Sequence, residues 1–401
     1  MAPRPARTTL RQMAWRRRPD CIRFHNSTAN DSTMDNCLIS ASDKILVTGS
    51  NGFIGTKVVE CLLQNGVSNI RCFARPSSHL ERLRTVLKQF PNASNVELIQ
   101  GDLLSREDCN SAAQGVSVIV HLAAGFQKSF SAVLNNSVMA TRNLLDAFLE
   151  CGTPLRFVHV SSFAVYSNLK MRRGEALDES SPLEDAPQDR HDAYCFGKLS
   201  QEKLLMEYNQ RRGLPYVILR PGAVFGPGKA DLTGRIGIRA PGLMIHVGGS
   251  NQLPLTYVDN CAEAITLATL KKGVDGEVFN VVDDNLLTSR QFLDAYRKRR
   301  RLLNIPIPYF AAYSFCALCE YGSRYLKLFP TRFNRRRCAA DWKGNRFSNR
   351  KLRQRLGWKP RVPMDQAMRN FLAQFEPVDE QKIPCENQRF SALRSATSKT
   401  L

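Results

Sequence analysis

Tyr194 and Lys198 stand four residues apart at the start of a helical pattern that continues through Leu205. The reference pKa of tyrosine, about 10, is too high for an efficient base near neutrality, but a neighbouring cation favours the phenolate. Because residues four apart share one face of a helix, Lys198 is expected to lower the pKa of Tyr194. Ser162 ends a preceding apolar run and would hold a substrate oxygen with its hydroxyl. These groups suit proton transfer that accompanies hydride transfer at a hydroxyl carbon.

Tyr166 and Lys170 repeat the same spacing. Tyr166 follows the apolar run 155–162 within four residues, and Ser167-Asn168 is typical of a turn rather than a helix interior. We therefore expect Tyr194–Lys198 to be the catalytic pair and Tyr166 to line the pocket.

A glycine-rich turn follows the apolar, β-branched run Lys44–Thr48, and a helical pattern begins near Phe53. Gly49, Gly52 and Gly55 would allow a sharp turn, close approach of backbone N–H groups to a pyrophosphate, and tight packing of helix on strand. Phosphates would then lie at the positive end of that helix. This arrangement of strand, loop and helix predicts a dinucleotide site.

The second apolar run ends Cys72-Phe-Ala-Arg75, without the acidic residue that commonly binds the adenosine ribose in NAD enzymes. A guanidinium at this point suits the 2′-phosphate of NADP, so Arg75 favours NADP over NAD. The alternative is an exposed loop arginine that stacks on adenine.

The spacing Gly-x-x-Gly-x-x-Gly after Thr48 resembles the extended short-chain dehydrogenases/reductases, the epimerase- and dehydratase-like branch of that superfamily. The resemblance runs from about Lys44 to Phe375 and includes Gly101-Asp-Leu103, His121-Leu-Ala-Ala124, Ser161-Ser162, Tyr194-Cys-Phe-Gly-Lys198, Arg220-Pro-Gly-Ala-Val-Phe-Gly-Pro227 and Leu356-Gly-Trp-Lys-Pro360. It implies that Ser162, Tyr194 and Lys198 are catalytic. It also implies cofactor contacts from Thr48, Gly49, Asn51, Gly52, Phe53, Ile54, Gly55, Asp102, Leu103, Leu122, Ala123, Ala124, Tyr194, Lys198, Pro221 and Val224, to which Arg75 is added from its position. His121, beside the cofactor, is expected to be a packed, neutral histidine.

Two segments, 255–262 and 305–319, are more similar to the 3β-hydroxysteroid dehydrogenase and dihydroflavonol reductase side of the branch, whose members act on apolar secondary alcohols and ketones. The resemblance therefore implies an NAD(P)-dependent oxidoreductase with a hydrophobic substrate. Gln252 stands where nucleotide-sugar members usually have an arginine, and Ser137 stands where the family commonly has an asparagine on the proton path. A sugar or nucleotide-sugar epimerase or dehydratase is the alternative. A nucleotide sensor or membrane-associated scaffold without catalysis is a third hypothesis, which the complete catalytic set disfavours.

Strand and helix patterns alternate through the first half of the chain, which predicts an α/β, Rossmann-type, doubly wound parallel sheet with a smaller C-terminal substrate lobe. The predicted strands are 44–48, 70–74, 96–101, 116–123, 155–162 and 216–220, and the predicted helices are 53–65, 79–89, 105–113, 129–151 and 192–212. We expect a disordered basic extension over 1–40, an NAD(P)-binding domain over 43–228 with 168–190 contributing to the substrate pocket, a substrate lobe over 229–376, and a flexible tail over 377–401. By analogy with the family, helices 129–151 and 192–212 would form a homodimer.

The net charge of +21 is concentrated in two regions. Residues 297–361 hold 19 Lys and Arg against two acids, and they enclose the apolar stretch 305–319. Such a segment suits an anionic membrane surface, or else a helix packed on the lobe among solvated arginines. Nucleic acid is not an expected partner, because no recognition module accompanies the charge. The arginine-rich first 33 residues resemble a transit peptide, or else Met34 is the true start.

Cys316 and Cys319 form a lone Cys-x-x-Cys pair within the apolar stretch. Without a second pair or nearby histidines, the pattern predicts buried thiols and no metal site. A reducing cytoplasm is the expected location, with contact to a membrane surface as an addition, since the sequence shows no secretory signal.

Overall fold

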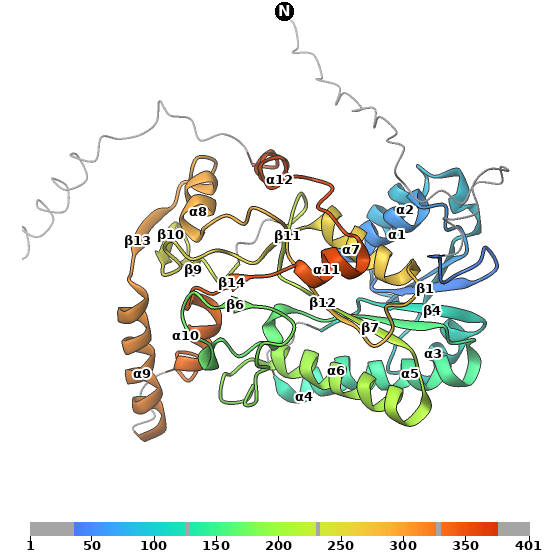
Figure 1. Ribbon diagram of the computed structural model, residues 1–401, viewed down its shortest axis with the longest axis horizontal. Coiled ribbons are helices and arrows are strands. Elements are labelled where there is room, and N and C mark those ends of the chain that lie inside the picture. The colour runs from blue at the N-terminus through green and yellow to red at the C-terminus, as the bar shows by residue number, and fades with distance from the viewer. Residues whose placement is uncertain (1–35, 126–128, 230–232, 326–329, 376–401) are drawn as a thin grey trace, which may run out of the picture.

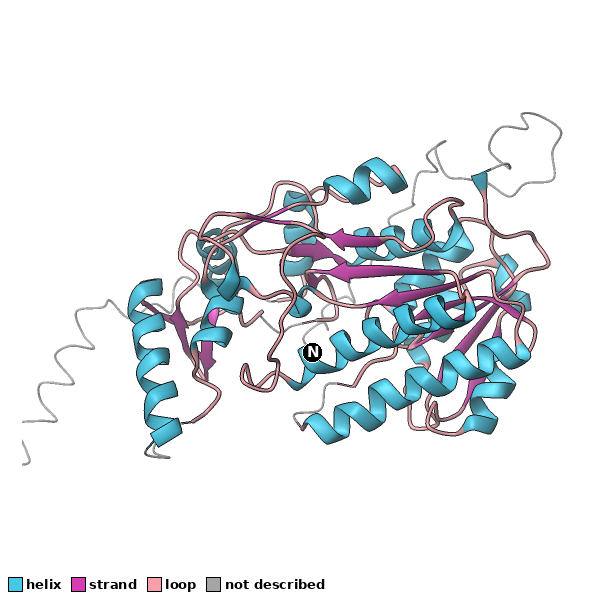
Figure 2. Ribbon diagram, turned by 60° about the horizontal axis from the view of Figure 1, so that its bottom comes forward, coloured by secondary structure: helices cyan, strands magenta, loops and turns pink. Residues whose placement is uncertain are grey.

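The computed structural model describes residues 36–125, 129–229, 233–325 and 330–375. Its centre is a seven-stranded parallel sheet in the order β12-β7-β5-β4-β1-β2-β3 (Figures 1 and 2). The strands are β1 (Lys44–Thr48), β2 (Ile70–Ala74), β3 (Glu97–Gln100), β4 (Val116–His121), β5 (Arg156–Val160), β7 (Tyr216–Pro221) and β12 (Val278–Val281). The sequence-based strands are confirmed to within two residues at each end. Apolar runs buried on both faces are typical of parallel sheets, and every residue of β1's neighbours β2 and β4 is buried.

Helices cover both faces of this sheet, as the alternating pattern predicts (Figure 1). One face is covered by α1 (Gly55–Gln64), α2 (Glu81–Leu87), α7 (Val258–Leu270) and α11 (Arg350–Leu356), whose apolar side chains share a core with Ile45 and Val47. The other face is covered by α3 (Arg106–Ala113), α5 (Ala140–Cys151) and α6 (Ala193–Arg212), which share a second core with Leu46 and Ile119.

The helix expected over 129–151 is not one continuous α-helix. It consists of α4 (Phe130–Val133), a π-helical turn at Leu134–Met139, and α5. A π turn inserts an extra residue into the helix and often marks a functional position. Here the π-helical turn contains Asn136, which lines the large cavity described in the next subsection.

The second lobe contains the three-stranded sheet β13-β10-β9 and two strand pairs, β8 with β11 and β6 with β14. Its elements are β6 (Ala176–Leu177), β8 (Ala223–Phe225), β9 (Gly237–Ala240), β10 (Leu243–His246), β11 (Leu255–Tyr257), β13 (Leu303–Pro306), β14 (Arg346–Phe347), α8 (Ser289–Arg297), α9 (Tyr309–Tyr325), α10 (Arg335–Trp342) and α12 (Met364–Leu372). An aromatic core around Phe225, Phe292 and Phe371 joins α8 and α12 to β8.

The chain returns to the first domain after entering the lobe. β12 pairs with β7 and becomes the edge strand of the main sheet, while α7 and α11 cover one of its faces. The expected domain boundary at residue 228 assigns β12, α7 and α11 to the substrate lobe, whereas they pack with the main sheet. Segment 168–190 lies beside the end of α10, where Lys343 Nζ donates to Leu169 O (3.0 Å). The residues that line the main cavity include none from this segment, and its contribution to a substrate pocket stays a prediction.

Other expectations fall on the lobe and the termini. Cys316 and Cys319 are buried thiols, as predicted, on the inner side of α9. Within the described ranges, no helix has the length and apolar character needed to cross a membrane. Of the disordered extension expected over 1–40, residues 36–40 are described: Leu38 N donates to Leu270 O (2.6 Å) and Ile39 is buried in the core. The predictions for residues 1–35 and 376–401 lie outside the described residues.

Candidate active site

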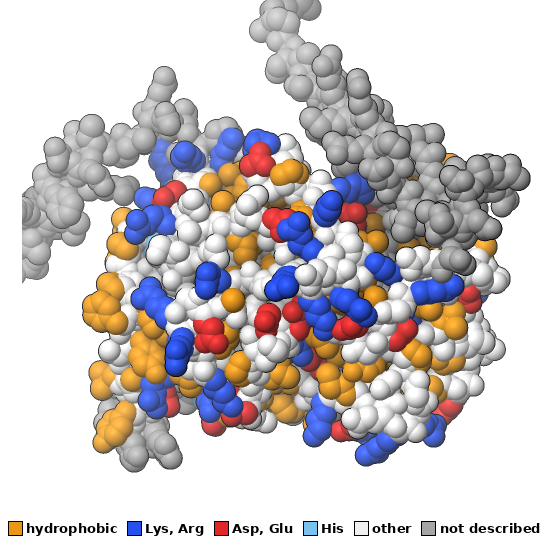
Figure 3. All heavy atoms as spheres, viewed as in Figure 1, with side chains coloured by type: hydrophobic (Ala, Val, Ile, Leu, Met, Phe, Trp, Pro, Cys, Tyr) orange, Lys and Arg blue, Asp and Glu red, His pale blue; other side chains and the backbone are white. Residues whose placement is uncertain are grey.

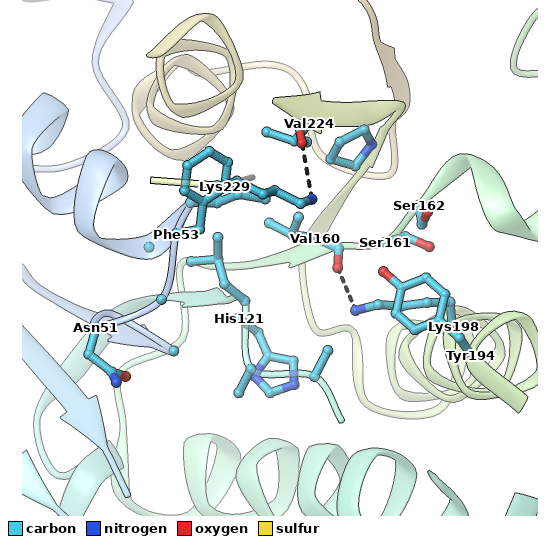
Figure 4. A pocket seen from close by; sticks show the side chains of 18 of the residues that line it. Asn51, Phe53, His121, Val160, Ser161, Ser162, Tyr194, Lys198, Val224 and Lys229 are labelled. Carbon is cyan, nitrogen blue, oxygen red and sulfur yellow. Dashed lines mark hydrogen bonds between the residues drawn. The ribbon is translucent and has the colours of Figure 1, made fainter. Parts of the chain in front are cut away.

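A cavity of about 850 Å³ lies where the sheet meets the lobe, at the carboxyl ends of β1, β2, β4, β5 and β7. Ligands of open α/β sheets bind at such a position. Figure 4 shows Asn51 and Phe53 on one side of the cavity and Ser162, Tyr194 and Lys198 on the other. The cavity therefore joins the glycine loop to the expected catalytic residues, as a dinucleotide with its reactive end beside a substrate would require.

The glycine loop is packed so closely that side chains are excluded at two positions. Gly49 has φ +69°, and a Cβ there would lie 3.0 Å from Ala123 N. A Cβ on Gly55 would overlap the carbonyl oxygen of Gly49. The first turn of α1 has no acidic side chain, so nothing in it repels a phosphate. These features fit a bound dinucleotide, with the loop as the cradle of its diphosphate.

The structure brings together nearly all residues that the sequence analysis singled out. Lining the cavity are Gly49, Asn51, Gly52, Phe53, Ile54, Gly55, Arg75, Asp102, Leu103, Leu122, Ala123, Ala124, Ser162, Tyr194, Lys198, Pro221 and Val224. Thr48 is the exception, because its side chain is fully buried behind the loop.

Thr48 instead holds His121 in a chain of hydrogen bonds. Thr141 Oγ1 donates its single hydrogen to Ser137 O (2.7 Å), so it must accept from His121 Nε2 (3.0 Å). His121 Nδ1 then accepts from Thr48 Oγ1 (2.8 Å). Burial lowers the pKa of His121 to about 3, with the Lys198 charge acting in the same direction. His121 is therefore the packed, neutral histidine that was expected, although its ring also borders the cavity.

Two elements position the catalytic candidates. Ser162 lies two residues after the end of β5, and Tyr194 and Lys198 lie in the first two turns of α6, which is capped by Asp192 accepting from Cys195 N (3.0 Å). Lys198 Nζ donates to Val160 O (2.7 Å; Figure 4). Tyr194 and Ser162 are within hydrogen-bonding reach of each other.

The pKa of Tyr194 is raised, whereas the sequence analysis expected Lys198 to lower it. Burial raises it to about 12, and the hydrogen bond with Ser162 opposes this only in part. The Lys198 ammonium is directed to Val160 O, and burial lowers the pKa of Lys198 to about 8. At neutral pH Tyr194 is a phenol, ready to give a proton rather than to take one.

Tyr166 does not line the cavity, so that expectation is wrong. Its ring is fully buried, its hydroxyl donates to Asn280 Oδ1 (2.6 Å), and it accepts from Arg220 Nη1 (3.0 Å). The 3₁₀ turn Phe163–Val165 directs the side chain into the interior, where it joins a buried polar network.

Some cavity residues were not found from the sequence. Lys229 donates to Val224 O (3.1 Å), with its Nζ 5.7 Å from the centre of the Phe53 ring, and Thr233 lies a few residues further on. Phe292 from α8 and Leu255 from β11 line the lobe side. The position of Lys229 directly after Gly226-Pro-Gly228 could have marked it as a cavity residue. Phe292 and Leu255 belong to apolar patterns that any core element would show, so the sequence does not distinguish them from core residues.

The lobe and the segment after β7 add apolar side chains to the cavity lining, namely Leu255, Phe292, Phe225, Ala223 and Val224. Gln252 lies outside this cavity, where its backbone pairs with Thr288. Among the described residues, His, Cys, Asp and Glu form no group of three or more that could hold a metal ion.

Comparison with known proteins identifies the family. The model of the NAD dependent epimerase/dehydratase family matches residues 45–281. The chain is 26% identical over 365 residues to 3beta-hydroxysteroid-dehydrogenase/decarboxylase isoform 1 of Arabidopsis thaliana, covering 84% of this chain and 81% of that protein. It is 31% identical over 252 residues to an uncharacterized UDP-glucose epimerase, YtcB, of Bacillus subtilis, covering 59% and 76%. In fold it is similar to the UDP-glucuronic acid 4-epimerase of Bacillus cereus solved with NAD, with a TM-score of 0.60 and 22% identity over 82% of this chain and 96% of that one.

The chain therefore belongs to the NAD dependent epimerase/dehydratase family, whose Rossmann-type sheet and dinucleotide loop it shares. It is an NAD(P)-dependent oxidoreductase of the extended short-chain dehydrogenase/reductase type.

Proposed function

We propose that the protein transfers a hydride between NADP(H) and a secondary alcohol or ketone of a hydrophobic substrate, with Ser162, Tyr194 and Lys198 as its catalytic residues. The observation that carries this proposal is a single cavity that has the glycine loop on one side, Ser162 and Tyr194 on the other, and apolar side chains of the lobe in its lining. The names of relatives such as the 3beta-hydroxysteroid-dehydrogenase/decarboxylase support a hydrophobic substrate.

A bound nicotinamide supplies the hydride or accepts it. In the reducing direction, the Ser162 hydroxyl holds the substrate oxygen and the Tyr194 phenol donates its proton to that oxygen. A phenol with a pKa of about 12 is fully protonated at pH 7, so the site is ready for this step. In the oxidising direction Tyr194 must first lose its proton, which the positive charges of Lys198 and of an oxidised nicotinamide favour.

The alternative is a sugar or nucleotide-sugar epimerase or dehydratase, supported by the named UDP-glucose epimerase relative. Two features weigh against it. Gln252, which replaces the arginine usual in nucleotide-sugar members, lies outside the cavity, and the cavity lining includes apolar side chains such as Leu255. Denaturing the purified chain and identifying released nucleotide distinguishes the two. Retained NAD would indicate a cofactor recycled within each turnover, whereas an empty chain that binds NADPH would indicate a reductase.

Replacing Tyr194 by Phe should reduce turnover at least about 100-fold, because the proton donor is lost, while NADPH binding changes little. The measurement is NADPH oxidation with a panel of ketosteroids, together with NADPH titration by fluorescence. Tyr166→Phe is the matched control, since it removes a hydroxyl outside the cavity at the same Tyr-x-x-x-Lys spacing. Full turnover in Tyr194→Phe would show that Tyr194 is not the acid.

We further propose that Arg75 gives the preference for NADP. It lines the cavity at the end of β2, where an adenosine 2′-phosphate would lie. Arg75→Gln should weaken NADPH binding by about tenfold or more, the value of a charge-assisted hydrogen bond, and leave NADH binding nearly unchanged. Arg84→Gln, an equal change of charge at an exposed position of α2, is the control. Equal affinity of the unaltered chain for NADH and NADPH would contradict this role.

We also propose that the protein is a homodimer that pairs the α4–α5 and α6 helices of two copies. Leu134 and Met139 are exposed large apolar side chains on the π-helical turn beside α6, and a second copy would bury them. Sedimentation velocity should give twice the mass of one chain, and a single-chain mass would contradict the dimer.

A contact with an anionic membrane is proposed for α9 and β13. Ala312, Cys316 and Cys319 face the lobe, whereas the opposite face of α9 exposes Phe310 (73%), Leu318 (60%) and Tyr321 (62%). Leu303 and Ile305 of the edge strand β13 extend this apolar surface, which Figure 3 shows beside Lys and Arg side chains. An apolar face among cations is complementary to an anionic bilayer surface.

The double variant Phe310→Ser, Leu318→Ser should bind vesicles of phosphatidylcholine and phosphatidylserine (7:3) at least about tenfold more weakly, because two large apolar groups no longer enter the lipid. Vesicle flotation at low and high salt is the measurement. Leu98→Ser, Leu104→Ser is the control, since both side chains are exposed outside α9 and β13. Equal binding to vesicles without phosphatidylserine would contradict the electrostatic part, and unchanged binding of the α9 variant would contradict the surface.

A further inference from the structure

A buried carboxylate lies one helical turn beyond Lys198 on α6. Glu202 is 2% exposed and forms a two-bond ion pair with Arg220 of β7, which is 3% exposed. Arg220 Nε donates to Glu202 Oε1 (3.0 Å) and Arg220 Nη2 donates to Oε2 (2.6 Å). The pair ties α6 to β7, the second strand from one edge of the main sheet.

The same carboxylate also reaches the end of β5. Ser161 Oγ donates to Glu202 Oε1, and Ser161 N donates to Leu219 O (2.7 Å). Ser161 lines the cavity and directly precedes Ser162. The position of Ser162 therefore depends on its neighbour Ser161, which is hydrogen-bonded to Glu202 of α6.

Most of the groups around Lys198 carry no negative charge that would stabilise its ammonium group. The titratable and charged groups that face Lys198 and Glu202 are His121 on β4, His159 on β5, Tyr216 and Arg220 on β7, and Tyr194 on α6, with Asp192 beside Tyr194 at the helix start. Burial lowers the pKa of His159 well below its usual range, so both histidines are neutral. Among the described groups that face Lys198 itself, Glu202 is the anion.

We propose that Glu202 is a positioning residue of the Ser162–Tyr194–Lys198 site, which fixes Ser161 and supplies the negative charge that keeps the buried Lys198 ammonium protonated. This role rests on the proposed catalytic set.

Glu202 is a buried anion that pairs with the buried cation Arg220 and lies one helical turn from the buried cation Lys198. Removing the charge of Glu202 would leave Arg220 and Lys198 buried without a counter-ion, which is costly. The guanidinium of Arg220 cannot give up its proton in a protein, so Lys198 is the group that would become neutral. Burial lowers the pKa of Lys198 to about 8, and the Glu202 charge opposes that shift.

The test measures the protonation of Lys198 directly, in the full chain and without turnover. Trace labelling of lysines with acetic anhydride over a range of pH, read by mass spectrometry, gives the midpoint for each lysine. In Glu202→Gln the midpoint of Lys198 should fall by about one pH unit or more. Lys57, which pairs with Asp259 on another face of the sheet, is the internal control and should not move.

Arg220→Met provides a test of opposite sign. It leaves the Glu202 carboxylate with Lys198 as its remaining cation, so the midpoint of Lys198 should rise. Tyr166→Phe breaks a hydrogen bond to the same guanidinium without changing charge, and should leave the midpoint where it is. If Glu202→Gln does not fold, the rise in Arg220→Met still decides the question.

A Lys198 midpoint that falls in Arg220→Met, or that stays unchanged in Glu202→Gln, would overturn the role of Glu202 whatever the activity. Failure of the proposed function has a different signature, namely NADPH-dependent turnover that survives Tyr194→Phe. In the active enzyme, the alkaline limb of the kcat profile should follow the Lys198 midpoint in each variant. A merely structural role would lower kcat without moving that limb.

Discussion

The close approach of two backbone segments at Gly49 and Gly55 is the constraint on which the rest of the site depends. A Cβ on Gly55 would occupy the position of the Gly49 carbonyl oxygen, and a Cβ on Gly49 would press on the backbone after β4. Only because both are absent can α1 begin directly above the end of β1 while β4 passes alongside. That contact creates the floor of the cavity and orients the first turn of α1 toward it.

On the opposite side of the cavity, α6 carries Tyr194 and Lys198 next to the end of β5. α6 presents Tyr194, Lys198 and Glu202 on successive turns of one face, so a single helix carries the proposed proton donor, the neighbouring cation and the buried anion. Asp192 caps this helix, and Gly197 lets it approach Val133 of α4, where a Cβ would overlap a methyl group. Helical geometry therefore sets the distances among Tyr194, Lys198 and Glu202, whereas Ser162 is placed by the segment after β5.

Burial, more than any pairwise charge, governs the proton equilibria on this side of the cavity. It raises the pKa of Tyr194 and lowers those of Lys198, His121 and His159, each toward the neutral form. Three interactions favour the charged forms instead. The Glu202 charge and the hydrogen bond to Val160 O favour the Lys198 ammonium, and the hydrogen bond with Ser162 lowers the pKa of Tyr194. A site of this kind is ready to donate a proton to a carbonyl oxygen, and it needs added positive charge before it can accept one.

The sequence by itself determined the order of strands and helices, the glycine loop and the Tyr194–Lys198 pair, because each is a local pattern of period, turn chemistry or one-turn spacing. Tertiary structure decided what local patterns do not encode. Thr48 turned away from the cavity to hold His121, Tyr166 entered a buried network with Arg220, and β12 returned from the lobe to complete the sheet. Phe292 and Leu255 became cavity residues for the same reason. Which face of an element meets which partner depends on packing between segments far apart in the chain, and so does the pKa of Tyr194, which depends on how much water that packing excludes.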